Sequence, residues 1–285
     1  MARGFRFGVQ AGTPTSASLG GQATATSEPR WAALARRAED HGYDVVSLPD
    51  HLDGQLAPLV ALAYVAAITD RIRLGVIVLA NDFRNFAVLA SEAATLDVLS
   101  GRRFELGLGA GWKITDYETA GIVLDPPGAR IERLAAAVAQ MRVALPSTVP
   151  IMLGGGGRKM LGLAAREADI VSIVTENTTG VAVTLGEDAS AARVRERVNW
   201  VNENASGRSF APELHTRIFA AADERYVSEM PVDEATASPH VLIRPARAMA
   251  DKLLHLRDQY GLSYFTVSER FIDEFVPVIE MLTPD

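Results

Sequence analysis

The stretch Ile72-Arg73-Leu74-Gly75-Val76-Ile77-Val78-Leu79 is almost continuously apolar. Such a run is typical of a parallel strand that is buried on both faces, because half-exposed strands alternate apolar with polar residues. A helical pattern precedes the run over Pro58–Thr69, and another follows it over Ala87–Leu99. The sequence therefore predicts a strand between two helices in a parallel α/β sheet.

The same alternation of strand and helix continues along the whole chain. The predicted strands are Phe5–Ala11, Asp44–Leu48, Ile72–Leu79, Arg103–Leu108, Val149–Leu153, Asp169–Val174, Leu214–Ala222 and Leu262–Val267. Besides the two helices above, helices are predicted between an N-cap at Ser27 and a stop at Gly42, and over Arg130–Leu145, Arg158–Ala168, Ala189–Asn204, Ala246–Tyr260 and Phe271–Leu282. Units of this kind in series close most naturally into a (β/α)8 TIM barrel, here a single domain of residues 1–285. A doubly wound open sheet is the alternative fold.

Composition excludes several classes of function. The formal net charge is -7 at pH 7, so a nucleic-acid partner is not expected. The chain has no cysteine, which rules out disulfides, thiolate catalysis and cysteine-ligated zinc. Asp50, His51 and Asp53 cluster, but no His-x-His or Glu-x-x-His pair accompanies them, so no metal site is predicted.

Membrane insertion and export are not expected either. The first ten residues lack the apolar core of a signal peptide, and the longest apolar run, Leu56–Ile68, is too short to span a bilayer, which needs about 20 residues. We therefore expect a cytoplasmic protein. The helix Pro58–Thr69 is apolar almost all round, which predicts a homodimer that buries it.

Candidate catalytic residues follow the predicted strands, because a barrel carries its chemistry at their carboxyl ends. His51 is the only histidine in such a place and is the candidate for proton transfer, with Asp50 beside it to orient a ligand or bias its charge. The structural alternative is that Asp50 caps the next turn and His51 packs at the rim. Lysine chemistry is disfavoured, since no lysine directly follows a strand.

Glycines mark two further places at this rim. The run Gly154-Gly155-Gly156-Gly157 stands between a strand and a helix, where bare backbone and helix N–H groups can hold a phosphate. Its alternative is a tight turn that needs positive φ angles. Gly109-Ala110-Gly111 would let a flat ring lie against the backbone or would only serve close packing, and it does not fit a dinucleotide fingerprint. Trp112 and Tyr117 either line a pocket or belong to the core.

The segment Leu96–Trp112, with Asp116-Tyr117, Ile151–Gly157 and Ala164–Asp169, resembles the bacterial luciferase-like monooxygenase superfamily and is most similar to its F420-dependent oxidoreductase branch. The resemblance spans most of the chain. It implies a (β/α)8 barrel that binds coenzyme F420, or alternatively FMN, and transfers a hydride to or from a small organic substrate.

The resemblance also assigns roles to residues. Asp50 and His51 match an acidic-histidine pair that contacts the ring and transfers protons. Val78, Leu79, Ala80 and Asn81 match a backbone bulge that braces the ring, often with a non-prolyl cis peptide. Gly109, Ala110 and Gly111 would run beside the ring, and Gly155 and Gly156 beside the ribityl phosphate.

Three departures from the family pattern weigh on these assignments. Leu145 leads through Pro146-Ser147-Thr148 directly into the next strand, without the hairpin that relatives insert there. Ile243-Arg244-Pro245-Ala246 replaces the usual Gly-Thr/Ser-Pro-Glu turn. Trp112 stands where sugar-phosphate-oxidising members carry a catalytic Glu, so that activity is not implied.

The alternatives to a deazaflavin-dependent oxidoreductase are an FMN-dependent monooxygenase, a non-catalytic flavin-binding barrel and a cofactor-free lyase or isomerase. The substrate would contact the loops Thr13–Thr26 and Arg225–Ile243, which hold no decisive motif.

Overall fold

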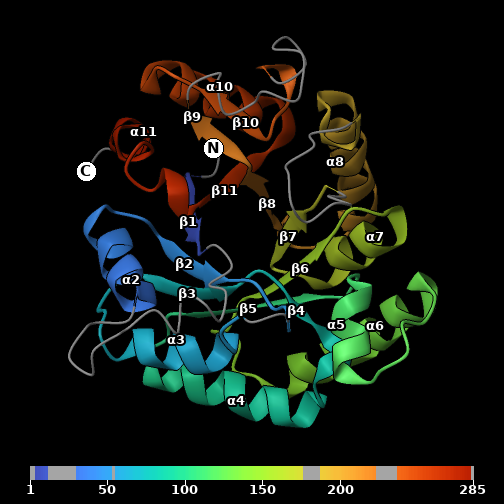
Figure 1. Ribbon diagram of the computed structural model, residues 1–285. Coiled ribbons are helices and arrows are strands. Elements are labelled where there is room, and N and C mark those ends of the chain that lie inside the picture. Colours follow the sequence, from blue (N-terminus) through green and yellow to red (C-terminus); the bar gives the residue numbers. More distant parts are fainter. Residues whose placement is uncertain (1–3, 12–29, 53–54, 176–186, 223–235, 284–285) are drawn as a thin grey trace.

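The computed structural model describes residues 4–11, 30–52, 55–175, 187–222 and 236–283. Within these residues the strands lie at the centre of the molecule and the helices surround them (Figure 1). Ser27 and the loop Thr13–Thr26 lie outside the described residues, as does much of Arg225–Ile243.

The strands form one closed parallel barrel. In chain order they are β1 (Arg6–Gln10), β2 (Val45–Leu48), β3 (Arg73–Val76), β4 (Leu79–Ala80), β5 (Phe104–Gly109), β6 (Ile151–Gly155), β7 (Ile170–Ile173), β8 (Glu213–Ile218) and β11 (Leu262–Ser268). Each pairs in parallel with its neighbours in the order β3-β2-β1-β11-β8-β7-β6-β5-β4, and β3 also pairs with β5, which closes the ring. The predicted (β/α)8 barrel is confirmed.

The helices follow the strands as the sequence predicts. They are α2 (Arg30–Asp40), α3 (Pro58–Ala66), α4 (Phe86–Leu99), α5 (Ile114–Ala120), α6 (Pro127–Ala144), α7 (Arg158–Glu167), α8 (Ala191–Ala205), α10 (Ala246–Tyr260) and α11 (Val276–Leu282). Their ends carry the expected signals. The side chain of Asn85 accepts a hydrogen bond from Ala87 N at 2.9 Å and caps α4, while Gly261, with φ of 72°, ends α10.

Three predicted elements differ from the observed ones, and one observed helix was not predicted. The predicted strand Ile72–Leu79 is interrupted at Ile77-Val78 and divides into β3 and β4. The predicted strand Leu214–Ala222 leaves the barrel after Ile218, and its end becomes β9 (Ala220–Ala222), which pairs with β10 (Val241–Ile243) in a separate parallel sheet. Helix α5 was not predicted, because only seven residues form it. The last helix begins at Val276, and Phe271 belongs to a preceding 3-10 turn.

The interior of the barrel is filled. Val45, Met152, Ile170 and Tyr264 form one buried cluster, with Ile77 and Val78 packed against it. They come from strands that are not all neighbours in the sheet, so they can meet only across the inside of the barrel. The interior is therefore a packed core and not a pore.

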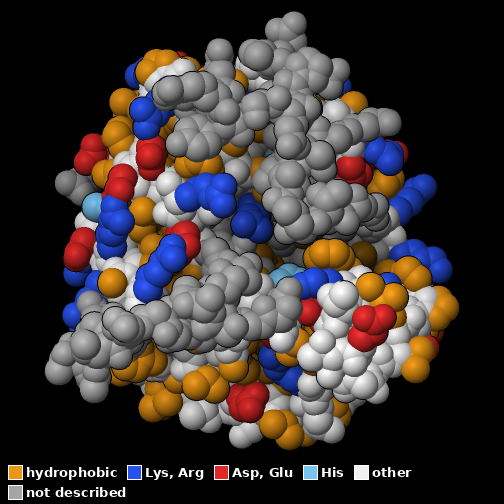
Figure 2. All heavy atoms as spheres, viewed as in Figure 1, with side chains coloured by type: hydrophobic (Ala, Val, Ile, Leu, Met, Phe, Trp, Pro, Cys, Tyr) orange, Lys and Arg blue, Asp and Glu red, His pale blue; other side chains and the backbone are white. Residues whose placement is uncertain are grey.

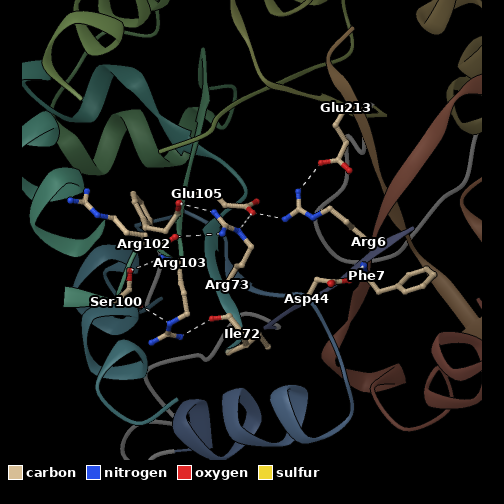
Figure 3. A network of polar contacts seen from close by, with 11 residues as sticks. Arg6, Phe7, Asp44, Ile72, Arg73, Ser100, Arg102, Arg103, Glu105 and Glu213 are labelled. Atoms are coloured by element: carbon tan, nitrogen blue, oxygen red, sulfur yellow. Dashed lines mark hydrogen bonds and ion pairs between the residues drawn. The ribbon is translucent and has the colours of Figure 1, made fainter. Parts of the chain in front are cut away.

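Charged residues close the end of the barrel where the strands begin (Figure 3). The guanidinium of Arg6 lies between two carboxylates, bonding Glu213 at 2.7 Å and also Glu105, and Arg73 bonds Glu105 from the other side. Glu105 is only 3% exposed. This end lies opposite the rim that carries chemistry in this fold, so we assign these residues a structural role.

None of the helices within the described ranges is long and apolar enough to cross a membrane.

Candidate functional site

The predicted site residues lie at or beyond the carboxyl ends of parallel strands. Asp50 and His51 follow β2, Asn81 follows β4, Ala110 follows β5 and Gly156 follows β6. Parallel strands end on one side of a barrel, so these segments share one mouth.

His51 is oriented by Asp116, a residue of α5. Nδ1 of His51 lies 2.7 Å from Oδ2 of Asp116, whose Oδ1 accepts the backbone N–H of Leu52 at 3.1 Å. Asp116 is 3% exposed. Because an ionised carboxylate only accepts hydrogen bonds, Nδ1 carries the hydrogen, and Nε2 is the nitrogen presented to a ligand. The ring of Trp112 stands perpendicular to the imidazole with centroids 5.8 Å apart.

Asp50 has different partners from those the sequence suggests. Its two oxygens lie 2.6 and 2.7 Å from the guanidinium nitrogens of Arg84, and one of them accepts the backbone N–H of Ala80 at 2.9 Å. Its side chain is 1% exposed. The carboxylate therefore fixes the chain after β4, and the orienting of His51 falls to Asp116. The predicted role of Asp50 in orienting a ligand remains a prediction.

A non-prolyl cis peptide joins Ile77 to Val78, at the start of the segment that the family resemblance singled out. The carbonyl oxygen of Ile77 accepts a hydrogen bond from the Gln10 side chain at 2.9 Å. A Cβ added at Gly109 would stand 2.7 Å from the Val78 side chain, and one at Gly154 would stand 3.0 Å from it. Close packing against Val78 therefore accounts for these two glycines.

Tyr117 is buried and does not line an open pocket, because it is only 1% exposed. Its hydroxyl is 3.1 Å from Oδ2 of Asp82 and 3.2 Å from the carbonyl oxygen of Ala110. Burial, and then the charge of Asp82, raise the pKa of Tyr117 to about 12, so the phenol stays protonated. Of the two predicted pocket aromatics, Tyr117 follows the core alternative, whereas Trp112 is 57% exposed at the mouth.

Two arginines of α6 support the same segment. Arg130 donates to the carbonyl oxygens of Ala110, at 3.0 Å, and of Gly111. Arg133 binds Asp82 at 2.7 and 3.0 Å. Burial alone would raise the pKa of Asp82, but the hydrogen bonds from Arg133 and Tyr117 outweigh it and hold that pKa below its usual range. The sequence pattern gave no signal for either arginine.

The glycine run begins within β6 and leads into helix α7. None of its glycines has a positive φ, so the positive-φ turn does not explain them. A Cβ at Gly155 would stand 2.2 Å from the Met160 side chain, and one at Gly156 would stand 2.5 Å from the carbonyl oxygen of Val174. At Gly157, by contrast, an added Cβ would meet no atom of the described residues within 4 Å. Packing of the described chain thus explains Gly155 and Gly156 but leaves space at Gly157.

The start of α7 offers the groups that an anion requires. No side chain caps α7, and its first turn holds two cations, Arg158 and Lys159, and no acid. Cations at a helix N-terminus are unfavourable, because the helix dipole is positive there. An anion bound at this end would balance the two positive charges and accept hydrogen bonds from the first N–H groups of the helix.

A cavity of about 340 Å³ opens beside the site and is lined by Asn81, Asp82, Arg84, Ile122, Val123, Asp125 and Arg133. Of the residues that the sequence singled out, Asn81 alone belongs to this lining. In the described parts of the chain, no three His, Asp or Glu side chains are grouped so as to hold a metal ion.

The model of the luciferase-like monooxygenase family matches residues 5–197. The chain belongs to this family. Among curated proteins it is similar to the 5,10-methylenetetrahydromethanopterin reductases of Archaeoglobus fulgidus, at 31% identity over 48% of the chain and 46% of the relative, and of Methanolobus tindarius, at 30% identity over 57% and 55%. The chain thus matches about half the length of these curated relatives.

Solved structures of similar shape share the luciferase-like barrel. An F420-dependent secondary alcohol dehydrogenase in complex with an F420-acetone adduct superimposes with a TM-score of 0.73 at 14% identity, covering 99% of both chains. An EDTA monooxygenase from Chelativorans sp. BNC1 gives a TM-score of 0.75 at 13% identity, over 98% of this chain and 94% of that one. At these identities the likeness establishes the fold.

Proposed function

We propose that this luciferase-like protein is an oxidoreductase that uses coenzyme F420 to transfer a hydride to or from a small organic substrate. The observation that carries the proposal is the pair His51 and Asp116 at the mouth of the barrel, 2.7 Å apart, with Trp112 beside it. The similarity to an F420-dependent glucose-6-phosphate dehydrogenase and the fold shared with the F420-dependent secondary alcohol dehydrogenase support the choice of cofactor.

The described residues fit such a cofactor in two places. The backbone from Val78 to Asn81 and from Gly109 to Gly111 would border the ring, and Gly154–Gly157 with the start of α7 would hold the phosphate. When bound, the deazaflavin supplies the carbon that accepts or gives the hydride.

His51 would handle the proton that accompanies this transfer. With the Nδ1 hydrogen held by Asp116, Nε2 can take a proton from a substrate hydroxyl or return it. Asp116 stabilises the imidazolium that results, since its carboxylate is buried and lies against the charge. Trp112 would shield the reacting groups from water.

An FMN-dependent monooxygenase is the second candidate, and the fold shared with the EDTA monooxygenase favours it. The two candidates use the same barrel mouth. A non-catalytic flavin-binding barrel is the third, since the chain lacks the hairpin before β6 and has the Arg244-Pro245 turn, whose peptide bond is cis.

Ligand titration tests the proposal directly. Purified protein would be titrated with FMN, reduced FMN, and F420 in both redox states, with fluorescence as the readout. Tight binding of F420 but not FMN is the expected result, and the reverse would favour the monooxygenase. Binding of neither would overturn all three flavin-based candidates.

A histidine variant separates an enzyme from a binder. His51→Gln should keep cofactor affinity within about threefold but lose hydride transfer, because glutamine cannot exchange a proton near neutral pH. His41→Gln is the matched control, since His41 is paired with Asp273 at 3.1 Å on the outside of the barrel.

A further inference from the structure

A buried arginine lies beneath the glycine turn that precedes α7. Arg197, from α8, is 5% exposed. Its Nε donates to the carbonyl oxygen of Gly156 at 3.0 Å, one terminal nitrogen donates to the backbone carbonyl of Asp188 at 2.8 Å, and the other pairs with the Asp188 carboxylate. All three guanidinium nitrogens are therefore engaged within the protein.

This hydrogen bond fixes the direction of the neighbouring N–H group. The peptide bond between Gly156 and Gly157 is trans, because the only cis bonds in the described chain are Ile77-Val78 and Arg244-Pro245. In a planar trans peptide the C=O and the N–H point in opposite directions. Since Arg197 holds the Gly156 carbonyl, the N–H of Gly157 points away from Arg197, at the residue where the added Cβ finds open space.

Backbone hydrogen bonds hold the two sides of the turn, because the carbonyl of Gly155 accepts the N–H of Val174 at 3.1 Å and that of Gly157 accepts the N–H of Leu161 at 3.0 Å. Arg197 holds the peptide between them. The absence of a Cβ gives Gly156 and Gly157 wide backbone freedom, and an N–H group that must meet an anion needs a fixed orientation to contribute to affinity. Burying a guanidinium is costly unless it is paired, and the pairing with Asp188 offsets that cost. Arg197 is thus a rigid support between α8 and the turn.

We propose that Arg197 is a positioning residue for a phosphate ester at the start of α7. It acts through the Gly156 peptide and does not touch the ligand. The ligand class is a ribityl phosphate, either the monoester of FMN or the diester of F420. This inference rests on the proposed function, because it presupposes a flavin or deazaflavin at the mouth.

Paired ligands with and without phosphate provide the test. Dissociation constants would be measured for FMN against riboflavin, and for F420 against the phosphate-free deazaflavin alcohol. The variants are Arg197→Lys and Arg197→Met, with Arg195→Met as the matched control. Arg195 lies on the same helix, but its guanidinium faces Tyr260, 3.4 Å from the hydroxyl.

We expect the preference for the phosphorylated ligand to fall about tenfold or more in both Arg197 variants, as expected for one misplaced hydrogen bond to a charged group. Affinity for riboflavin or the deazaflavin alcohol should stay within about twofold, and Arg195→Met should keep the wild-type preference. A merely structural role would instead lower the thermal midpoint and weaken both members of a pair equally.

Two negative results have different meanings. If wild-type protein prefers the phosphorylated ligand and the Arg197 variants keep that preference, the role of Arg197 is disproved and the proposed function stands. If wild-type protein binds none of the four ligands, the proposed function falls and the role of Arg197 falls with it.

Discussion

Nδ1 of His51 lies 2.7 Å from the carboxylate of Asp116, a residue 65 positions further along the chain. The pair joins the loop after β2 to the short helix after β5. A histidine whose ring is fixed by a buried carboxylate has a defined tautomer, and this is the arrangement that general base catalysis requires.

Replacing Asp116 by asparagine should release that tautomer. In Asp116→Asn, the 15N chemical shifts of the His51 ring should change from a fixed Nδ1–H form to a mixture of forms, and hydride transfer should slow by about 10² or more. Asp258→Asn serves as the control, because Asp258 is 61% exposed and pairs with its neighbour Arg257. Unchanged ring shifts in Asp116→Asn would contradict the assignment.

Asp50 should matter more for stability than for proton transfer. Asp50→Asn leaves Arg84, which is 21% exposed, without its charged partner. We expect the free energy of unfolding to fall by about 2 kcal/mol, less than the 3–5 kcal/mol of a fully buried pair. Chemical denaturation measures it. The double variant Asp50→Asn/Arg84→Met should recover part of the loss, and a larger loss in the double variant would count against the pair.

Gly156 and Gly157 should respond differently to alanine. Gly156→Ala would bring a Cβ to 2.5 Å from a backbone carbonyl, so it should destabilise the fold. Gly157 has φ of -86° and space for a Cβ among the described residues. In Gly157→Ala the free energy of unfolding should therefore stay within about 0.5 kcal/mol of the wild-type value or rise slightly. The same variant should weaken F420 or FMN binding about tenfold if the space holds phosphate. Calorimetry and ligand titration measure the two effects, and undiminished affinity would refute a phosphate at Gly157.

Two buried histidines should make the fold sensitive to acid. Burial, then the charges of Arg6 and Arg217, lower the pKa of His215 to about 3, and burial lowers the pKa of His240 to about 4. Both groups bind protons more readily in the unfolded chain, where the pKa is about 6.5. The stability that the fold has with both histidines neutral is therefore fully present above pH 6.5. It is lost as the pH falls toward 4 for His240 and toward 3 for His215.

Below pH 6.5, the free energy of unfolding should fall by up to about 1.4 kcal/mol per pH unit for each histidine. Denaturation curves between pH 7 and 4.5 would show it, and His215→Gln should be less steep by about that amount per unit. His255→Gln, on the outer helix α10, is the control. An equal slope in His215→Gln would show that His215 is not neutral in the fold.

A homodimer through α3 remains a prediction. Val60 and Tyr64 on this helix are 74% and 48% exposed, and hydrophobic side chains line the lower edge of the molecule in Figure 2, where Figure 1 places α3 and α4. The double variant Val60→Lys/Tyr64→Lys should be monomeric in sedimentation, whereas the wild type should dimerise as its concentration rises. A wild type that stays monomeric at every concentration would defeat the prediction.

Hydrophobic periodicity was sufficient to predict the barrel. Parallel strands covered on both faces leave continuous apolar runs, and the helices between them carry caps and stops that can be read locally. The same continuity hides interruptions. Neither the break at Ile77-Val78 nor the departure of the chain from the barrel after Ile218 changes the apolar pattern, because the residues on both sides remain buried.

The candidate site was only partly predictable. His51 could be found because it follows a strand. Asp116 belonged to the family resemblance, but its pairing with His51 was missed because the helix that carries it has only seven residues and was not predicted. Asp50 is the neighbour of His51 in sequence and yet binds Arg84, since side chains that follow one another point in different directions. Arg197 and Arg130 were missed for the same reason, because each acts on a distant backbone carbonyl that no sequence pattern identifies.

The packed interior has a kinetic consequence. Among the described residues, Val78 and the cluster around Tyr264 fill the barrel and leave no passage along its axis, so a molecule that reaches His51 must enter and leave by the same mouth. A large cofactor seated deep in that mouth cannot pass a substrate already lying above it. An enzyme with such a site would follow an ordered mechanism, in which the deeper ligand binds first and leaves last.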